Sequence, residues 1–112
     1  AGGAGAQVAQ GQALAQSKGC VACHTVDGRP GVGPTWKSLY GKMQTLADGS
    51  TALVDEAYLG RSIREPMAQV VKGFPPIMPP AALSDEELAA LVAYIQSLGA
   101  PAQAAPEQKV QR

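Results

Sequence analysis

The chain has 112 residues, with nine basic and nine acidic side chains and a formal net charge of zero. This length predicts a single domain, and the balanced charge argues against a nucleic-acid-binding surface, which needs an excess of Lys and Arg. No apolar run approaches the length of a membrane span, and no basic-then-apolar secretory leader is present.

The first segments in chain order are a linker and a helix. Residues 1–6 contain only Ala and Gly and are predicted to be linker. The composition from about Gln7 to Gly19 favours a helix, and the residues expected on one face are Val8, Gly11, Leu14 and Ala15. A glycine inside a helix costs stability, so Gly11 indicates either close approach of another helix or simply a weak helix.

The stretch Cys20-Val21-Ala22-Cys23-His24 is typical of the attachment site of a c-type haem. Each thiol would form a thioether with a haem vinyl group, and His24 would bind the iron through one ring nitrogen. A zinc site would be one ligand short, because the chain has two Cys and one His. A thioredoxin-like pair needs β-rich flanks, which are absent here, and a plain disulfide is the third alternative. We expect haem.

The middle of the chain is predicted to be mostly loop. Turn signals mark residues 25–33, and residues 35–40 are expected to form a short helical turn. Trp36 and Leu39 within it would be core residues or, beside a haem, part of its wall. Residues 41–50 read as a loop with a turn at Asp48-Gly49.

Two further helices are predicted from their end signals. One begins after Asp55 as N-cap and stops at Pro66, with Leu59 and Ile63 on one face; residues 67–72 add another helical turn. The last begins with a capping box formed by Ser84 and Glu87 and ends at Gly99. Its apolar stripe is Leu88, Leu91, Val92, Ile95 and Leu98. Residues 100–112 are predicted to be a flexible tail.

A single chain with one histidine cannot make a bis-histidine haem, so the second iron ligand is sought among the methionines. The candidates are Met43, Met67 and Met78, and a methionine is more often core filler than ligand. Met78 is favoured because four prolines stiffen the segment from Gly73 to Pro80 around it. His24 and Met78 together would fill both axial positions and raise the reduction potential, which describes an electron carrier and not an enzyme. A haem peroxidase or gas-binding protein, with an open iron, and a non-redox binding module remain alternatives.

Residues 7–98 resemble class I cytochrome c in the Cys20–His24 motif, Gly33-Pro34, the helix ending at Pro66, Met78 and the closing helix. The resemblance implies an all-α fold with about three main helices and short helical turns around one covalently bound haem c, in a domain spanning 7–99. It implies that the Pro34 carbonyl accepts a hydrogen bond from His24, and that Gly11 lies at a helix crossing near Leu91 or Tyr94. It implies a haem lining of Trp36, Leu39 and Ile63, with Lys42 near a propionate.

A narrower resemblance is to the cytochrome c domain of subunit II of caa-type cytochrome c oxidases. The matching segments are Tyr40-Gly41, Thr45–Ser50, Asp55–Leu59, Val71–Pro79 and Leu83–Glu87. This implies a domain tethered at the periplasmic face of the bacterial cytoplasmic membrane. It would accept electrons from a soluble donor and pass them to the binuclear copper centre of the same subunit, without reducing oxygen itself. A free soluble mono-haem cytochrome c is the alternative.

Overall fold

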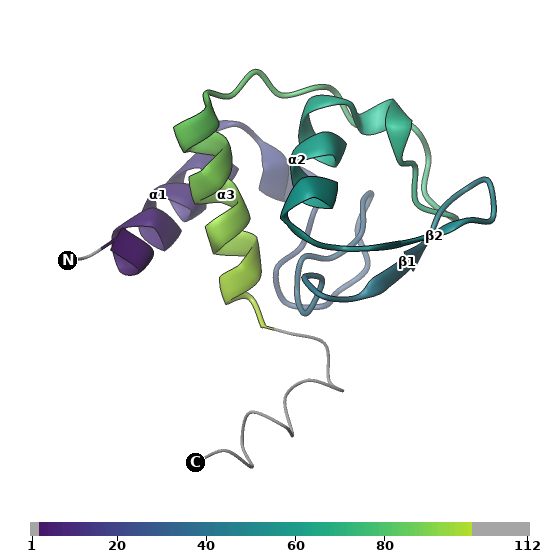
Figure 1. Ribbon diagram of the computed structural model, residues 1–112, viewed down its shortest axis with the longest axis horizontal. Coiled ribbons are helices and arrows are strands. Elements are labelled where there is room, and N and C mark those ends of the chain that lie inside the picture. Colours follow the sequence, from purple (N-terminus) through teal and green to yellow (C-terminus); the bar gives the residue numbers. More distant parts are fainter. Residues whose placement is uncertain (1–2, 100–112) are drawn as a thin grey trace, which may run out of the picture.

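The computed structural model describes residues 3–99, which contain three α-helices and a small hairpin (Figure 1). The helices are α1 (Gly3–Ser17), α2 (Glu56–Arg64) and α3 (Asp85–Ser97). Short 3-10 turns η1 (Cys20–Ala22) and η2 (Pro66–Ala68) and the strands β1 (Met43–Thr45) and β2 (Thr51–Leu53) complete the secondary structure. The prediction of three main helices with short helical turns is confirmed. Within residues 3–99, no helix is both long and apolar enough to cross a bilayer.

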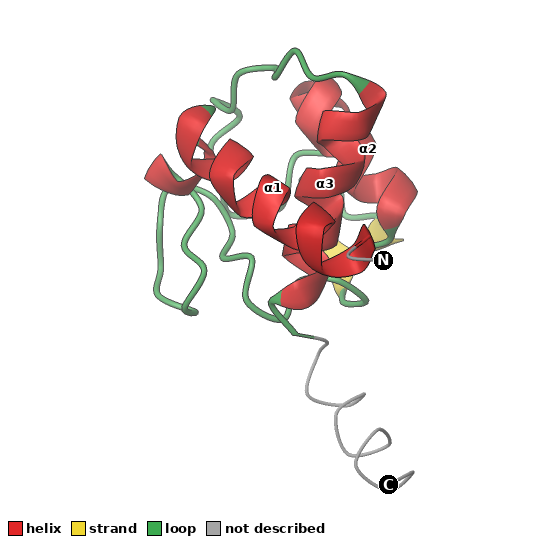
Figure 2. Ribbon diagram, turned by 90° about the vertical axis from the view of Figure 1, so that its left-hand side faces the viewer, coloured by secondary structure: helices red, strands yellow, loops and turns green. Residues whose placement is uncertain are grey.

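Helices α1 and α3, from opposite ends of the described chain, cross at Gly11 (Figures 1 and 2). A methyl group built on Gly11 would overlap the Ala90 carbonyl oxygen and lie 2.8 Å from Cβ of Tyr94. Ala15, one turn further along, is fully buried. Close helix approach is therefore the reason for Gly11, and the predicted contact with Tyr94 is confirmed.

Helix α1 begins at Gly3, so residues 3–6, which were predicted to be linker, are helical. Ala is the strongest helix former, and the alanines at positions 4 and 6 favour continuing the helix through Gly5 despite the cost of glycine. A Cβ at Gly5 would meet no atom within 4 Å, so this end of α1 projects away from the rest of the protein. The remaining linker residues 1–2 and the predicted tail 100–112 lie outside the described residues.

The predicted loop at 41–50 contains β1, which pairs antiparallel with β2 in the register Met43–Leu53, Gln44–Ala52 and Thr45–Thr51. The turn at Asp48-Gly49 is confirmed: Gly49 has φ of 91°, and the Ser50 amide donates to Asp48 Oδ1 at 2.9 Å. Alternation along β1 buries Gln44 and leaves Met43 and Thr45 exposed. Three-residue strands are too short to show this alternation as a sequence pattern.

Residues 35–40 form a hydrogen-bonded turn where a short helical turn was expected. The Leu39 amide donates to the Trp36 carbonyl at 3.2 Å, but Ser38 has φ of 57°, in the left-handed region. A right-handed helix cannot continue through that conformation. The Ser38 amide instead donates to the Leu98 carbonyl at 3.2 Å, which fixes the turn to the end of α3.

The predicted helix ends are confirmed. Asp55 Oδ1 accepts from the Tyr58 amide at 2.8 Å at the start of α2, which stops before Pro66. Ser84 and Glu87 form both hydrogen bonds of the capping box of α3. Helices α2 and α3 each bury one face in a single core, which includes Trp36, Leu39, Val54, Leu59, Ile63, Leu91 and Ile95.

Candidate haem site

One cavity of about 450 Å³ lies between the Cys20–His24 motif and the proline-rich segment. Its lining includes all eight residues predicted for the cofactor site: Cys20, Cys23, His24, Pro34, Trp36, Leu39, Ile63 and Met78. Trp36, Leu39 and Ile63 are buried apolar side chains. The fold thus brings residues from α2, η1 and two separate loops to a single, mostly apolar space.

The orientation of His24 is fixed by a hydrogen bond of 2.8 Å between its Nδ1 and the Pro34 carbonyl oxygen. A carbonyl oxygen is only an acceptor, so Nδ1 carries the proton and Nε2 keeps its lone pair. Burial lowers the pKa of the His24 imidazole, and the Pro34 hydrogen bond partly offsets this. The lowered pKa favours the neutral ring, the form in which histidine binds a metal.

Two neighbours confine the imidazole further. The Trp36 ring stacks on it with centroids 5.2 Å apart and an interplanar angle of 21°, and Tyr94 meets Trp36 edge-on at 6.2 Å. Gly33 lies against it so closely that an added Cβ would be 2.6 Å from Cε1 and 2.9 Å from Nδ1 of His24. Sequence reasoning identified Gly33-Pro34 as a motif but missed the steric role of Gly33, for which a glycine next to a proline is the only signal.

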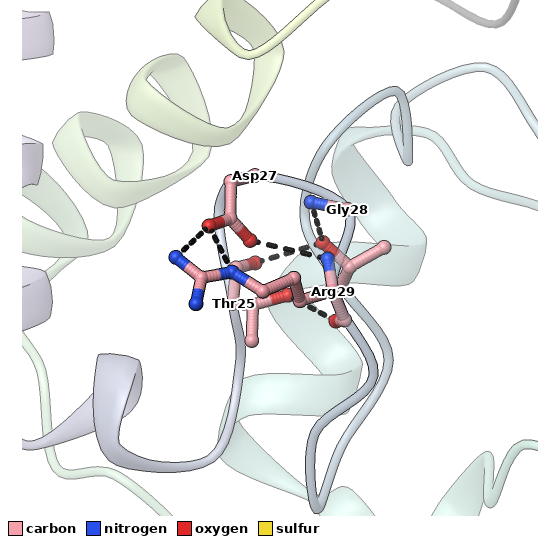
Figure 3. Close-up of polar contacts among 5 residues, drawn as sticks. Thr25, Asp27, Gly28 and Arg29 are labelled. Atoms are coloured by element: carbon pink, nitrogen blue, oxygen red, sulfur yellow. Dashed lines mark hydrogen bonds and ion pairs between the residues drawn. The ribbon is translucent and has the colours of Figure 1, made fainter.

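The loop after His24 is held by its own polar contacts, shown among Thr25, Asp27, Gly28 and Arg29 in Figure 3. Thr25 Oγ1 donates to the Arg29 carbonyl at 2.6 Å, and the Arg29 guanidinium reaches Asp27 at 2.7 Å. The Arg29 backbone and side-chain hydrogen bonds lower the pKa of Asp27. Thr35 Oγ1 closes the loop by donating to the Thr25 carbonyl at 3.0 Å. These hydrogen bonds hold the loop in the conformation that places the Pro34 carbonyl next to the His24 ring.

The two cysteines lie on the turn that follows α1. Gly19, with φ of 78°, ends the helix, and η1 then carries Cys20, which is half-buried, toward the exposed Cys23. The His24 amide donates to the Cys20 carbonyl at 3.0 Å, which closes the turn. Burial raises the pKa of the Cys20 thiol. Both thiols are free of disulfide bonds and border the same cavity as the imidazole.

The three methionines differ in their placement. Met78 is half-buried, packs against the core and lines the cavity. Met67 borders the cavity but is 64% exposed, and Met43 is 56% exposed on the outer face of the hairpin, away from the cavity lining. Met78 is therefore the methionine whose side chain the fold directs to the site.

Three parts of the chain supply the polar side chains on the cavity wall: Gln44 from β1, Tyr58 and Ser62 from α2, and Gln69 from the segment that follows η2. Gln69 Nε2 donates to Ser62 Oγ at 2.8 Å and to the Tyr58 carbonyl at 3.2 Å. Burial raises the pKa of Tyr58, and a hydrogen bond with Ser62 partly offsets this. Lys42, expected near a propionate, is exposed and lies outside the cavity lining, and Gln44 occupies the wall two residues further on.

This donor set fits a haem c. An apolar space suits the porphyrin, two thiols on one turn suit its vinyl groups, and a neutral imidazole and a thioether are ligands for iron. The ring nitrogen of His24 that would not bind the iron is hydrogen-bonded to the Pro34 carbonyl. A backbone carbonyl is the kind of group that fixes the tautomer of a metal-binding histidine.

Comparison with known proteins agrees with this geometry. The family model described as "Cytochrome c" matches residues 8–99. The cytochrome c-551 of Pseudomonas aeruginosa is 34% identical over 93 residues, which cover 83% of this chain and 81% of that protein. The class I cytochrome c fold inferred from the sequence is confirmed, and so is a single covalently bound haem c. The chain therefore belongs to the cytochrome c family, whose domains act in electron transfer.

Proposed function

We propose that this chain transfers electrons through a haem c attached at Cys20 and Cys23 and ligated by His24 and Met78. The observation that carries the proposal is the convergence of these four side chains on one cavity. The fixed tautomer of His24 supports it, because the hydrogen bond to Pro34 leaves Nε2 available for iron.

Each residue has a distinct task in this proposal. When bound, the haem supplies an iron that alternates between the ferric and ferrous states. His24 is held in place by Pro34, and the Met78 thioether would stabilise the ferrous state and so raise the reduction potential. Trp36, Leu39 and Ile63 exclude water from the cavity. Two protein ligands leave no open position for oxygen or substrate, so the chain is proposed to be a carrier and not an enzyme.

The test is made on protein matured with the haem-attachment machinery. Its mass is expected to include one covalent haem, its ferric spectrum to show the methionine-to-iron band near the red end, and its ferrous form to bind no carbon monoxide at neutral pH. A colourless protein that folds normally would contradict the haem site. Carbon monoxide binding would favour a haem peroxidase or gas-binding protein.

We further propose that the chain is the cytochrome domain of subunit II of a caa-type oxidase, at the periplasmic face of a bacterial membrane. The support is the set of oxidase-like segments, two of which are joined in space. The Lys72 amide donates to the Thr45 carbonyl at 3.0 Å, which links the hairpin to the segment leading to Met78. The Ala47 amide donates to the carbonyl of Val70, the residue just before that segment, at 2.8 Å. The proposed partners are a soluble electron donor and the binuclear copper centre of the same subunit.

A free mono-haem carrier is the second candidate, because the match to cytochrome c-551 extends over 81% of that protein. Stopped-flow mixing of the reduced, matured chain with a copper-loaded subunit II domain separates the two. The oxidase assignment predicts rapid oxidation by that domain and slower oxidation by an unrelated copper protein of similar potential. Equal rates would favour the free carrier. A reading frame that also encodes transmembrane helices and the copper ligands would favour the oxidase.

A further inference from the structure

Gln44 is buried, with 7% of its surface exposed. In the part of the chain whose burial the structure describes, no other buried residue is both polar and non-aromatic. Gln44 lies in the middle of β1, where pairing with Ala52 fixes its direction. Its neighbours Met43 and Thr45 point outward, and Gln44 lines the haem cavity. The hairpin therefore places an amide in a predominantly apolar wall.

The Gln44 amide takes no part in the side-chain hydrogen bonds found among residues 3–99. Its cavity neighbour Gln69, by contrast, donates to Ser62 and to the Tyr58 carbonyl. No fully enclosed side-chain nitrogen or oxygen in the described chain lacks a partner, so the Gln44 amide keeps some accessible surface, and the residue borders the cavity. Covering an amide without giving it a hydrogen bond is costly, so we expect a group that fills the cavity to supply an acceptor.

We propose that Gln44 is a positioning residue that donates a hydrogen bond from its side-chain amide to one haem propionate. The periphery of a haem is apolar except for its two propionate carboxylates, which accept hydrogen bonds. The other wall residue with an amide, Gln69, already uses its donor within the protein. Lys42 is exposed outside the cavity lining, and Arg61 lies 3.9 Å from Glu65 on the surface of α2.

This inference rests on the haem site proposed above, so its test begins with matured protein that shows the methionine-to-iron band. Nuclear Overhauser spectra of the ferrous ¹⁵N-labelled protein are expected to connect the Gln44 side-chain amide protons with propionate methylene protons. This measurement needs no variant. Cross-peaks to ring methyl groups alone, or amide protons that contact only water, would overturn the assignment while leaving the haem site intact.

Variants give a second readout, the reduction potential. Gln44→Leu removes the donor at similar volume, so the propionate charge is less compensated, the ferric state is favoured and the potential falls. Gln44→Glu adds a negative charge and is expected to lower it further. Thr45→Val, on the exposed face of the same strand, is the control and is expected to leave the potential unchanged. Potentials of both Gln44 variants equal to that of the control would refute the role.

Discussion

The two sides of the haem cavity are held in different ways. On the His24 side, hydrogen bonds connect the loop to itself, including Gly33 to Cys23 at 2.9 Å, Trp36 to Thr25 at 2.8 Å and His24 to Pro34 at 2.8 Å. On the Met78 side, the nearest backbone hydrogen bonds are Ile77 to Pro75 at 2.9 Å and Ala81 to Ile63 at 3.1 Å.

Covalent stiffness replaces hydrogen bonding on the Met78 side. Four of the eight residues from Gly73 to Pro80 are proline, which lack an amide hydrogen and have a fixed φ. Such a segment loses little conformational entropy on folding but also gains few bonds to the rest of the protein. We therefore expect Met78 to leave the iron more readily than His24.

The largest expected effect comes from Met78→Ala, which removes the proposed thioether ligand from the Met78 side of the cavity. The fold is expected to persist because the His24 side has its own hydrogen bonds. The iron becomes accessible, the reduction potential falls and the ferrous protein binds carbon monoxide, as measured by absorption titration. Met67→Ala is the control, since Met67 is 64% exposed. Survival of the methionine-to-iron band in Met78→Ala would assign the ligand elsewhere.

Gly33→Ala is expected to displace the His24 ring on the other side of the cavity. The added Cβ would lie 2.6 Å from Cε1 of His24, so the ring must move away from the Pro34 carbonyl. Overpacking of this kind costs about 1–3 kcal/mol, seen as a lower melting temperature with an altered potential. Gly5→Ala is the control, because an added Cβ there meets no atom within 4 Å, and it is expected to keep or raise the melting temperature, since Ala favours a helix. A melting temperature of Gly33→Ala equal to that of the unsubstituted protein would show that the ring is not confined by Gly33.

Pro79→Ala tests whether stiffness holds Met78. Freeing one proline φ at a compatible site typically costs about 0.4–1 kcal/mol, so added imidazole is expected to displace the methionine about two- to fivefold faster. Pro30→Ala, in the loop of the His24 side, is expected to leave this rate unchanged. The comparison fails if both variants accelerate displacement equally.

The smallest effect concerns pH. The hydrogen bonds and ion pair with Arg29 lower the pKa of Asp27, so their contribution is present above the unfolded-state pKa and is lost as pH falls through the folded one. Hydrogen exchange of the Trp36 amide is expected to accelerate as pH falls from about 5 to 2, beyond the intrinsic trend. Asp27→Asn is expected to remove that dependence, and Asp48→Asn, in the hairpin, to preserve it.

The sequence predicts the parts of this protein that depend on local chemistry. The Cys20–His24 motif, the caps at Asp55 and Ser84 and the turn at Asp48-Gly49 each depend on a few adjacent residues. The lining by Trp36, Leu39 and Ile63 came from the family resemblance, and the structure places all three on the cavity wall.

Features that depend on distant partners were not predictable. The strands around Gln44 are stabilised by pairing with residues 51–53 and by a bridge from Leu46 to Val71, and three-residue strands show no clear periodicity. The steric role of Gly33 and the inward direction of Gln44 follow from the same long-range contacts. The early start of α1 was missed because alternating Ala and Gly are typical of linkers as well as of helix ends.

The contact of Gly11 with Ala90 has a consequence for how the molecule assembles. Helices α1 and α3 meet only when nearly the whole described chain has been brought into one loop, and closing so long a loop is entropically slow. Once formed, this interface joins the two ends of the described chain directly. Two fragments produced by a single cut in the exposed stretch 27–32 are therefore expected to reassociate in solution through α1 and α3.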